Sequence, residues 1–195
     1  MASDEKARWD ERYASGEYQP RTEPAPLVEL AIHYVPPARA LVLACGAGRN
    51  ALRLAEAGFG VDAIDVSSVA IEMAGKAARE RGVDVNWRVA DLEEIEIEPD
   101  SYDLITMIRY NNRNLWPAMM RALKPNGWIL MEQHLRTNRD VVGPSGPFRV
   151  DPGEILEAFG DFRIVEYFEA FGPFGRAGET TATNGILACK GDPGW

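Results

Sequence analysis

The chain has 195 residues, of which 46% are hydrophobic and 26% are charged, a balance typical of a globular domain with a sizeable core. Its formal net charge of −9 argues against nucleic acid and anionic membrane surfaces as partners, because both are bound through clustered Lys and Arg. No apolar run approaches the ~20 residues that span a bilayer, and the first residues lack the apolar segment of a signal peptide. Two cysteines, Cys45 and Cys189, are too few for a disulfide framework, so we expect a cytoplasmic protein.

We predict a single domain, 1–195, that begins with a helical cap over residues 1–36. Residues 4–15 are expected to form a polar helix, ended by a glycine. An extended connector with three prolines follows over 18–26. Residues 26–34 carry apolar side chains at helical spacing and predict a second helix.

Residues 37–190 are predicted to form the core, in which strands and helices alternate. The strands are expected at 40–44, 61–66, 85–89, 102–108 and 128–133. The helices between them are expected at 50–57, 67–81 and 115–123. This alternation predicts a doubly wound α/β fold with a parallel sheet.

The segment after the fifth strand has a different composition. Residues 135–150 are polar and rich in Gly and Pro, which predicts a functional loop. A short helix is expected over 152–159, with Asp151 as its N-cap and Pro152 at its first position.

Two further strands are expected at the end of the core, at 162–171 and 180–190. A Gly-rich turn separates them, so an antiparallel hairpin is the simplest arrangement. Residues 191–195 are expected to be a tail, and the sequence contains no internal repeat.

The stretch 41–50, Leu-Val-Leu-Ala-Cys-Gly-Ala-Gly-Arg-Asn, leads from an apolar strand through a small-residue turn into a helix. Gly46 and Gly48 lack a Cβ, which lets the backbone approach a ligand closely. The helix start behind them offers unpaired N–H groups to polar or anionic ligand atoms. Asp65 ends the next strand and is placed to accept hydrogen bonds from ribose hydroxyls. The sequence therefore predicts a nucleotide-like cofactor at this turn.

Two cofactors are compatible with the turn. Gly46-x-Gly48-x-x-Ala51, followed by Asp65, fits the dinucleotide fingerprint and allows an NAD-dependent oxidoreductase. Against NAD, the chain leaves little room for a second half-sheet and a substrate domain, and a final hairpin is not expected of such a domain. In addition, Asp91 follows the third strand and is placed to reach an adenine amino group.

The motifs taken in order make a more specific pattern. They are the stretch 41–50, Asp65-Val66-Ser67, Ala90-Asp91-Leu92, Tyr102-Asp103-Leu104 and Leu123-Lys124-Pro125-Asn126-Gly127. This set resembles the class I S-adenosylmethionine-dependent methyltransferases. Within them the chain resembles the small tellurite-resistance-type and thiopurine-type enzymes, whose opening is similar to Trp9-Asp10-Glu11-Arg12-Tyr13 and whose later segments are similar to Arg109-Tyr110 with Arg113 and to Pro147-Phe148.

The resemblance implies a seven-stranded, mostly parallel sheet with an antiparallel last strand, and S-adenosylmethionine as cofactor. It implies that the glycine turn faces the methionine moiety, that Asp65 faces the ribose, that Asp91 faces the adenine, and that the backbone near Ile108 lies beside the sulfonium. The cofactor-binding positions carried over in this way are Ala44, Cys45, Gly46, Gly48, Arg49, Asn50, Asp65, Val66, Ser67, Asp91, Leu92 and Ile108.

The chain also departs from the family pattern. Val42 stands where many members have an acidic residue, and Asn112 stands where a histidine is frequent. Thr180, Thr181 and Thr183 occupy a strand that is more basic in oxyanion-handling relatives, which disfavours tellurite as substrate. The signatures of nucleobase-amine and pyrimidine-carbon methylation are missing.

Candidate residues for the acceptor side follow the fourth and fifth strands, at the edge where such sheets bind ligands. Tyr110, Arg113 and His134 are the candidate catalytic residues, and Asn111 joins Trp9 and Tyr13 as a candidate substrate contact. Each has a structural alternative: packing of the first helix for the two N-terminal aromatics, a solvated loop for residues 110–113, and a bystander role for His134. The acidic run 93–98 is expected to be solvated, so no metal site is predicted.

We expect transfer of a methyl group from S-adenosylmethionine to a small molecule, possibly a thiol or chalcogen compound, by a monomer or homodimer. Methyl transfer from a sulfonium mainly needs alignment of the reacting atoms. The alternatives are an NAD-dependent oxidoreductase and a catalytically silent cofactor-binding module, which the residue Val42 leaves open.

Overall fold

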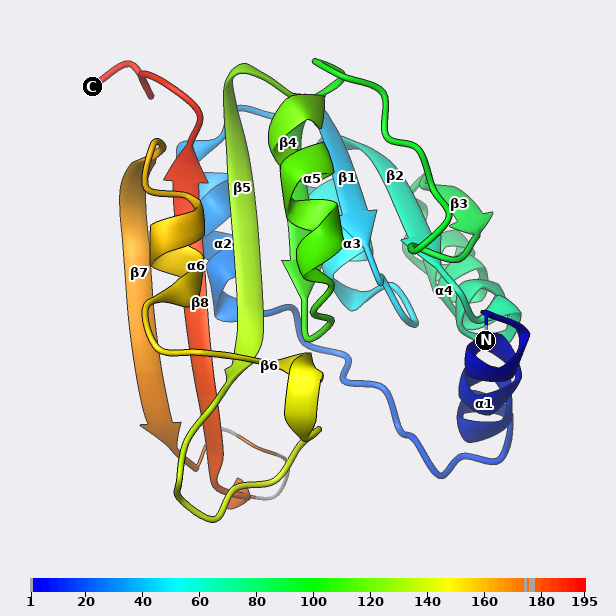
Figure 1. Ribbon diagram of the computed structural model, residues 1–195. Coiled ribbons are helices and arrows are strands. Elements are labelled where there is room, and N and C mark those ends of the chain that lie inside the picture. Colours follow the sequence, from blue (N-terminus) through cyan, green and yellow to red (C-terminus); the bar gives the residue numbers. More distant parts are fainter. Residues whose placement is uncertain (1, 174, 176–177) are drawn as a thin grey trace.

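The structure is a computed structural model that describes residues 2–173, 175 and 178–195. Its centre is an eight-stranded sheet in which seven strands follow the order β3-β2-β1-β4-β5-β8-β7 and β6 pairs with β5 alone (Figure 1). The strands are β1 (Arg39–Leu43), β2 (Gly60–Asp65), β3 (Asn86–Val89), β4 (Tyr102–Ile108), β5 (Leu123–Leu135), β6 (Arg149–Val150), β7 (Arg163–Gly172) and β8 (Thr181–Cys189).

The pairing of the strands confirms the predicted fold. β1 pairs in parallel with β2 and β4, β2 with β3, and β4 with β5. β8 runs antiparallel to both β5 and β7, so the last strand of the chain is the one that reverses direction. The strand β6 was not predicted: its two residues pair with His134 and Leu135 at the end of a long β5, and two residues carry no readable periodicity.

In the described residues six α-helices flank the sheet, with α5 and α6 in front of it and α2 and α3 behind it in the view of Figure 1. They are α1 (Ala2–Ala14), α2 (Pro26–Tyr34), α3 (Arg49–Glu56), α4 (Ser68–Arg81), α5 (Trp116–Ala122) and α6 (Glu154–Ala158). Two short 3₁₀ turns, Arg113–Leu115 and Gly146–Phe148, precede α5 and β6.

The predicted start of the sixth helix was wrong. α6 begins at Glu154 with Gly153 as N-cap, and neither Asp151 nor Pro152 belongs to it. The carboxylate of Asp151 instead pairs with Arg136 at 2.8 Å, which removes it as a cap. Gly153 adopts a φ of 75°, a left-handed conformation that an L side chain disfavours.

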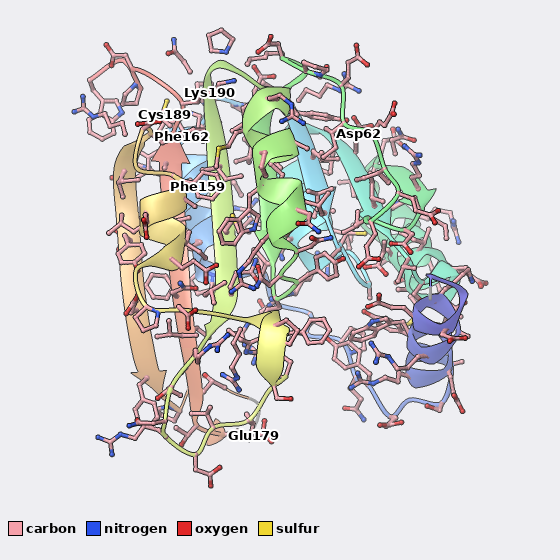
Figure 2. All side chains as sticks on the ribbon, in the orientation of Figure 1. Asp62, Phe159, Phe162, Glu179, Cys189 and Lys190 are labelled. Carbon is pink, nitrogen blue, oxygen red and sulfur yellow. The ribbon has the colours of Figure 1, made fainter. Side chains whose placement is uncertain are left out.

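The two faces of the sheet bury separate apolar cores. The front core gathers Met107 and Met131 from the sheet with Phe159 at the end of α6. Phe159 packs edge to face on Phe162 with ring centroids 5.5 Å apart (Figure 2). The rear core gathers Val28 of α2 and Leu54 of α3 with side chains of the central strands. Burial of both faces explains why the central strands read as continuous apolar runs.

The first helix is fastened to the core through one carboxylate. Asp10 of α1 accepts hydrogen bonds from Ser67 Oγ at 2.7 Å and from the backbone N–H of Val69 at 3.1 Å. It also pairs with Lys6. Burial raises the pKa of Asp10, but these hydrogen bonds outweigh burial and hold it well below the usual range. Because Ser67 and Val69 lie at the start of α4, the carboxylate also complements that helix dipole.

Candidate active site

A cavity of about 870 Å³ opens at the carboxyl ends of the parallel strands, the place where open α/β sheets bind ligands. Its walls come from α1, from the ends of β1, β2, β4 and β5, and from the loop before β6. The predicted site residues that line it are Trp9, Tyr13, Ala44, Cys45, Gly46, Arg49, Asn50, Asp65, Val66, Asp91, Leu92, Ile108, Tyr110, Asn111 and His134. Gly48, Ser67 and Arg113 do not line it.

The glycine turn is shaped by contacts on both of its sides. A Cβ on Gly46 would lie 2.8 Å from the hydroxyl oxygen of Tyr13, so the bare backbone lets α1 approach the turn. A Cβ on Gly48 would meet Trp87 and Ala74 at 2.8 and 2.9 Å. Gly48 therefore serves the packing of the turn on β3 and α4, whereas Gly46 faces the cavity.

Asp65 holds the turn and faces the cavity at once. Its Oδ2 accepts a hydrogen bond from the N–H of Gly46 at 2.7 Å, and its Oδ1 accepts one from the N–H of Ser67 at 2.9 Å. Burial raises the pKa of Asp65, against the effect of these backbone donors. Each carboxylate oxygen accepts one of these bonds and has a further lone pair, so ribose hydroxyls could bind the same group.

Ser67 has a structural position in α4. It is fully buried, and its Oγ caps the helix by accepting from the N–H of Ala70 at 3.1 Å. The same Oγ donates to Asp10, so Ser67 joins the end of β2 to α1.

Three aromatic rings from the N-terminal segment cover one side of the cavity. The centroid distances are 6.0 Å between Trp9 and Tyr13 and 5.1 Å between Tyr13 and Tyr18. The guanidinium of Arg12 lies 4.7 Å from the centroid of the Trp9 ring. Trp9 and Tyr13 thus pack on one another and also line the cavity, and their contact with a substrate stays a prediction.

The cofactor side of the cavity fits a nucleoside-bearing ligand. Two carboxylates, of Asp65 and Asp91, meet the cavity at the ends of β2 and β3, and apolar side chains of Val66, Leu92 and Ile108 lie between the polar groups. The volume falls in the range of about 300–1,000 Å³ that small-molecule sites occupy. S-adenosylmethionine, with its ribose hydroxyls and adenine amino group, matches this set of acceptors.

Two titratable side chains on the acceptor side of the cavity, Tyr110 and His134, are neutral at neutral pH. Burial raises the pKa of Tyr110 to about 12. Burial, together with the positive charges of Arg109, Arg149 and Arg21, lowers the pKa of His134 to about 4. The Nδ1 atom of His134 is buried without a hydrogen-bond partner among the described residues. His134 is therefore an uncharged imidazole and a weak base.

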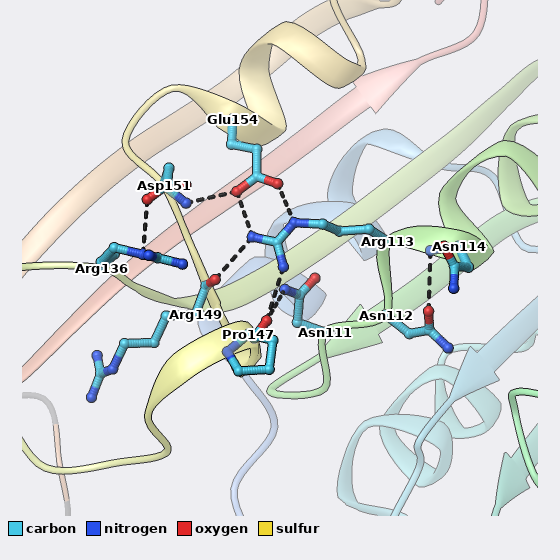
Figure 3. A network of polar contacts seen from close by, with 9 residues as sticks. All are labelled: Asn111, Asn112, Arg113, Asn114, Arg136, Pro147, Arg149, Asp151 and Glu154. Atoms are coloured by element: carbon cyan, nitrogen blue, oxygen red, sulfur yellow. Dashed lines mark hydrogen bonds and ion pairs between the residues drawn. The ribbon is translucent and has the colours of Figure 1, made fainter.

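Arg113 binds the segment 147–154, next to the cavity residue Asn111 (Figure 3). It forms a two-pronged ion pair with Glu154, and its Nη1 and Nη2 donate to the carbonyls of Pro147 at 2.8 Å and Arg149 at 2.9 Å. Asn111, which does line the cavity, donates to the same carbonyl of Pro147 at 3.2 Å. Arg113 was predicted as catalytic, and that role stays a prediction; its side chain binds Glu154 and two backbone carbonyls and does not line the cavity.

Sequence reasoning did not select Arg109 or Arg149 as site residues. Arg109 follows β4 and pairs with the buried carboxylate of Glu132 at 2.9 Å. Arg149 is 9% exposed and donates to the carbonyls of Leu135, Pro144 and Val142. The sequence signal for Arg109 was its place in a segment that resembles the family. Arg149 has backbone carbonyls as partners, and such contacts leave no signal in the sequence.

The described residues contain neither a metal-ligand group nor a membrane-spanning helix. No group of three or more His, Cys, Asp or Glu side chains is arranged to hold a metal ion in that part of the chain. No helix there combines the length and apolar character needed to cross a bilayer.

Comparison with known proteins agrees with this geometry. Residues 40–127 match the family described as "Methyltransferase domain". Ubiquinone biosynthesis O-methyltransferase of Rickettsia akari is 32% identical over 104 residues, which cover 51% of this chain and 41% of that protein. The probable S-adenosyl-L-methionine-dependent methyltransferase TehB of Haemophilus influenzae is 25% identical over 153 residues, which cover 74% of this chain and 53% of TehB. The matches thus span about half the length of these relatives.

Solved structures share the fold over most of the chain. TehB from Haemophilus influenzae superposes with a TM-score of 0.77 at 24% identity, covering 93% of this chain and 67% of TehB. The cyclase SpnF superposes with a TM-score of 0.67 at 18% identity, covering 85% of this chain and 80% of SpnF. The chain thus resembles S-adenosylmethionine-dependent methyltransferases in sequence over residues 40–127 and in fold over most of its length, and it is similar to TehB in both.

Proposed function

We propose that the protein transfers a methyl group from S-adenosylmethionine to a small-molecule acceptor, and that a thiol or another soft chalcogen nucleophile is the favoured acceptor. The observation that carries this choice is the acceptor side of the cavity. Tyr110 has a pKa of about 12 and His134 has one of about 4, so neither is matched to remove a proton at neutral pH. A thiolate needs no such base, whereas a phenol or an amine does.

S-adenosylmethionine, when bound, supplies a methyl group that its positive sulfur already activates. Transfer breaks the carbon–sulfur bond, whose electron pair stays on the sulfur, while a lone pair of the acceptor forms the new bond. The residues of this chain would hold and orient the two reactants and exclude water. Such alignment can lower a barrier by about 7–11 kcal/mol.

We propose that the cofactor binds at the glycine turn, Asp65, Asp91, Leu92 and the end of β4.

The cytoplasm is the proposed location, since both cysteines are free and buried, as suits a reducing compartment. The wider fold does not decide the chemistry, because SpnF, described as a cyclase, has the same architecture. An experiment on the acceptor is therefore needed.

Calorimetry with S-adenosylmethionine, S-adenosylhomocysteine and NAD(H), followed by a screen for S-adenosylhomocysteine release, tests the proposal. We expect the two sulfur cofactors to bind, NAD(H) not to bind, and thiols to be methylated in preference to simple phenols. Binding of NAD(H) alone would support the oxidoreductase. Cofactor binding without product from thiols, selenite or phenols would support the silent module, in which Val42 replaces a usual anchor.

A further inference from the structure

A second cavity, of about 590 Å³, lies next to the first and on the rear face of the sheet. Residues 21–26 of the connector form one wall, and Phe168, Ala170 and Thr183 of β7 and β8 form another. Arg21, Arg49 and Arg109 line both cavities. These three arginines therefore form the partition between them.

The partition carries more positive than negative charge, although the whole chain has a net charge of −9. Among the described residues beside it, Glu132 of the second cavity is a buried carboxylate, 7% exposed, and it pairs with Arg109. The guanidinium of Arg49 donates to the carbonyl of Glu23 at 2.8 Å and forms no ion pair with any described residue. The carboxylate of Glu132 attracts both Arg49 and Arg109, so one negative charge faces two guanidinium groups, and an anionic ligand would restore the balance of charge.

The positive charges of neighbouring arginines also lower the pKa of a group inside the first cavity. Besides burial, the charges of Arg109, Arg149 and Arg21 lower the pKa of His134, which lines that cavity. Arg149 is held only by backbone carbonyls, so no described carboxylate neutralises it. The acidic residues that line the two cavities near this end, Glu23 and Glu179, are exposed.

Arg109 is held in an unfavourable backbone conformation at this position. Its φ is 62°, in the left-handed region that residues with a Cβ seldom adopt. The N–H of Arg109 donates to the carbonyl of Glu132 at 2.7 Å, and the Nε donates to the carboxylate of the same residue at 3.1 Å. Strained residues of this kind concentrate at ligand sites. The conformation places the guanidinium in the partition, one residue after Ile108.

The second cavity also has an apolar surface. Phe168, Ala170 and Ala25, with the rings of Pro24 and Pro26, face it. An inorganic oxyanion at the arginines would leave this surface uncovered. An organic anion would cover it with its carbon skeleton and so gain from burial of apolar area.

We propose that the methyl acceptor is an organic anion, a thiol that carries a carboxylate, bound with its carboxylate at Arg49 and Arg109 and with an apolar substituent next to the carboxylate in the second cavity. The thiolate sulfur would then enter the first cavity and take the methyl group from S-adenosylmethionine, and the thiol proton leaves to solvent. This inference rests on the proposed function and names the substrate class of the same site.

Two thiols of equal length that differ in charge test the inference. With mercaptohexanoate and mercaptohexanol, kcat/KM is measured by S-adenosylhomocysteine release. We expect a preference of about tenfold or more for the carboxylate, the size of a charge-assisted hydrogen bond. Arg109→Gln should abolish the preference, and Arg136→Gln, whose side chain lines neither cavity, should keep it. Equal kcat/KM for both thiols in the parent protein would overturn the inference and leave methyl transfer intact.

A second pair of variants guards against misfolding and tests the cavity itself. Arg109→Gln combined with Glu132→Gln leaves no unpaired buried carboxylate and should show the same loss of preference. Ala170→Leu narrows the second cavity and should raise KM severalfold for 2-butyl-3-mercaptopropanoate, which carries an alkyl branch beside its carboxylate, with no change for unbranched 3-mercaptopropanoate. Equal effects on the two acids would contradict the placement of the apolar substituent.

Binding measurements separate this inference from the proposed chemistry. Calorimetry of hexanoate and hexanol with the protein loaded with S-adenosylhomocysteine needs no turnover. Tighter binding of hexanoate that depends on Arg109 supports the anion site even if neither thiol is methylated, an outcome that would contradict only the thiol chemistry. Equal or absent binding of both compounds would reject the anion site even if thiols are methylated.

Discussion

Asp65 combines two duties in one side chain. Its carboxylate joins the turn after β1 to the start of α4 through the N–H groups of Gly46 and Ser67, and the same carboxylate faces the cofactor side of the cavity. A single residue at the end of β2 thus sets the geometry of the glycine turn as well as the chemistry that the turn presents.

Asp65→Ala is predicted to weaken binding of S-adenosylmethionine by about tenfold or more, because it removes a charged acceptor for ribose hydroxyls. The melting temperature should fall as well, since two buried N–H groups lose their partner. Calorimetry and thermal denaturation measure the two effects. Asp84→Ala, at an exposed position, is the matched control. Unchanged affinity in Asp65→Ala would mean that the ribose lies elsewhere.

His134 predicts a pH dependence of stability. Burial, with Arg109 and neighbouring arginines, lowers its pKa from 6.5 to about 4 in the folded protein. The unfolded chain therefore binds this proton first, and the contribution to stability is present above pH 6.5 and declines as the pH falls toward 4. His134→Gln should flatten the melting-temperature profile across this window. His33→Gln, at an exposed position, should leave the profile unchanged.

At the level of secondary structure, two ion-paired elements shape the cavity: the segment 147–154 and the helix α1. Arg113, in the 3₁₀ turn before α5, anchors the segment 147–154 through Glu154 and two carbonyls. Asp10 anchors α1 on the start of α4. Neither residue supplies its side chain to the cavity, but each fixes an element that does.

Arg113→Ala is predicted to raise KM for the acceptor and to change cofactor affinity little, because the segment that it holds lies on the acceptor side. Glu154→Gln should act in the same direction, and the double variant should be less than additive, since the two residues form one interaction. Arg136→Ala removes an exposed pair with Asp151 and should be nearly neutral. Acceptor kinetics measure KM, and calorimetry measures cofactor affinity. Equal losses of acceptor and cofactor binding would mean that Arg113 stabilises the fold and has no specific effect on the acceptor side.

Asp10→Ala is predicted to loosen α1 and to weaken cofactor binding, because Trp9 and Tyr13 line the cavity from this helix. Hydrogen exchange should show faster exchange for the amides of α1 than in the parent protein, with those of β4 unaffected. Glu11→Ala, on the same helix and exposed, is the control. Unchanged exchange in α1 would show that its aromatic contacts suffice to hold it.

At the scale of the whole molecule, local sequence patterns predict most of the sheet. Buried parallel strands are continuous apolar runs between helical segments, so β1, β2, β4 and the following helices are readable from the chain. The strand β6 and the start of α6 are not, because they depend on Arg149 and Glu154 finding distant partners.

The same division holds for the site. The cofactor side lies in turns directly after strands, so motif spacing places the glycine turn, Asp65 and Asp91 on one cavity. The acceptor side is built from pairs such as Arg109 with Glu132, which lie on neighbouring strands and have no fixed spacing in the sequence. Sequence reasoning therefore selected Arg113 and overlooked Arg109, although only Arg109 lines the cavity.

The bonding of Asp65 has a consequence for protein engineering. A designer who wishes to change which nucleoside this fold accepts cannot exchange that residue freely, because the backbone of the glycine turn would lose its fastening at the same time. Asp91 offers a freer position: its carboxylate accepts one described hydrogen bond, from the N–H of Glu93 at 2.9 Å, within its own loop. Selection for altered cofactor analogues should therefore begin with libraries at the end of β3 and keep the end of β2 constant.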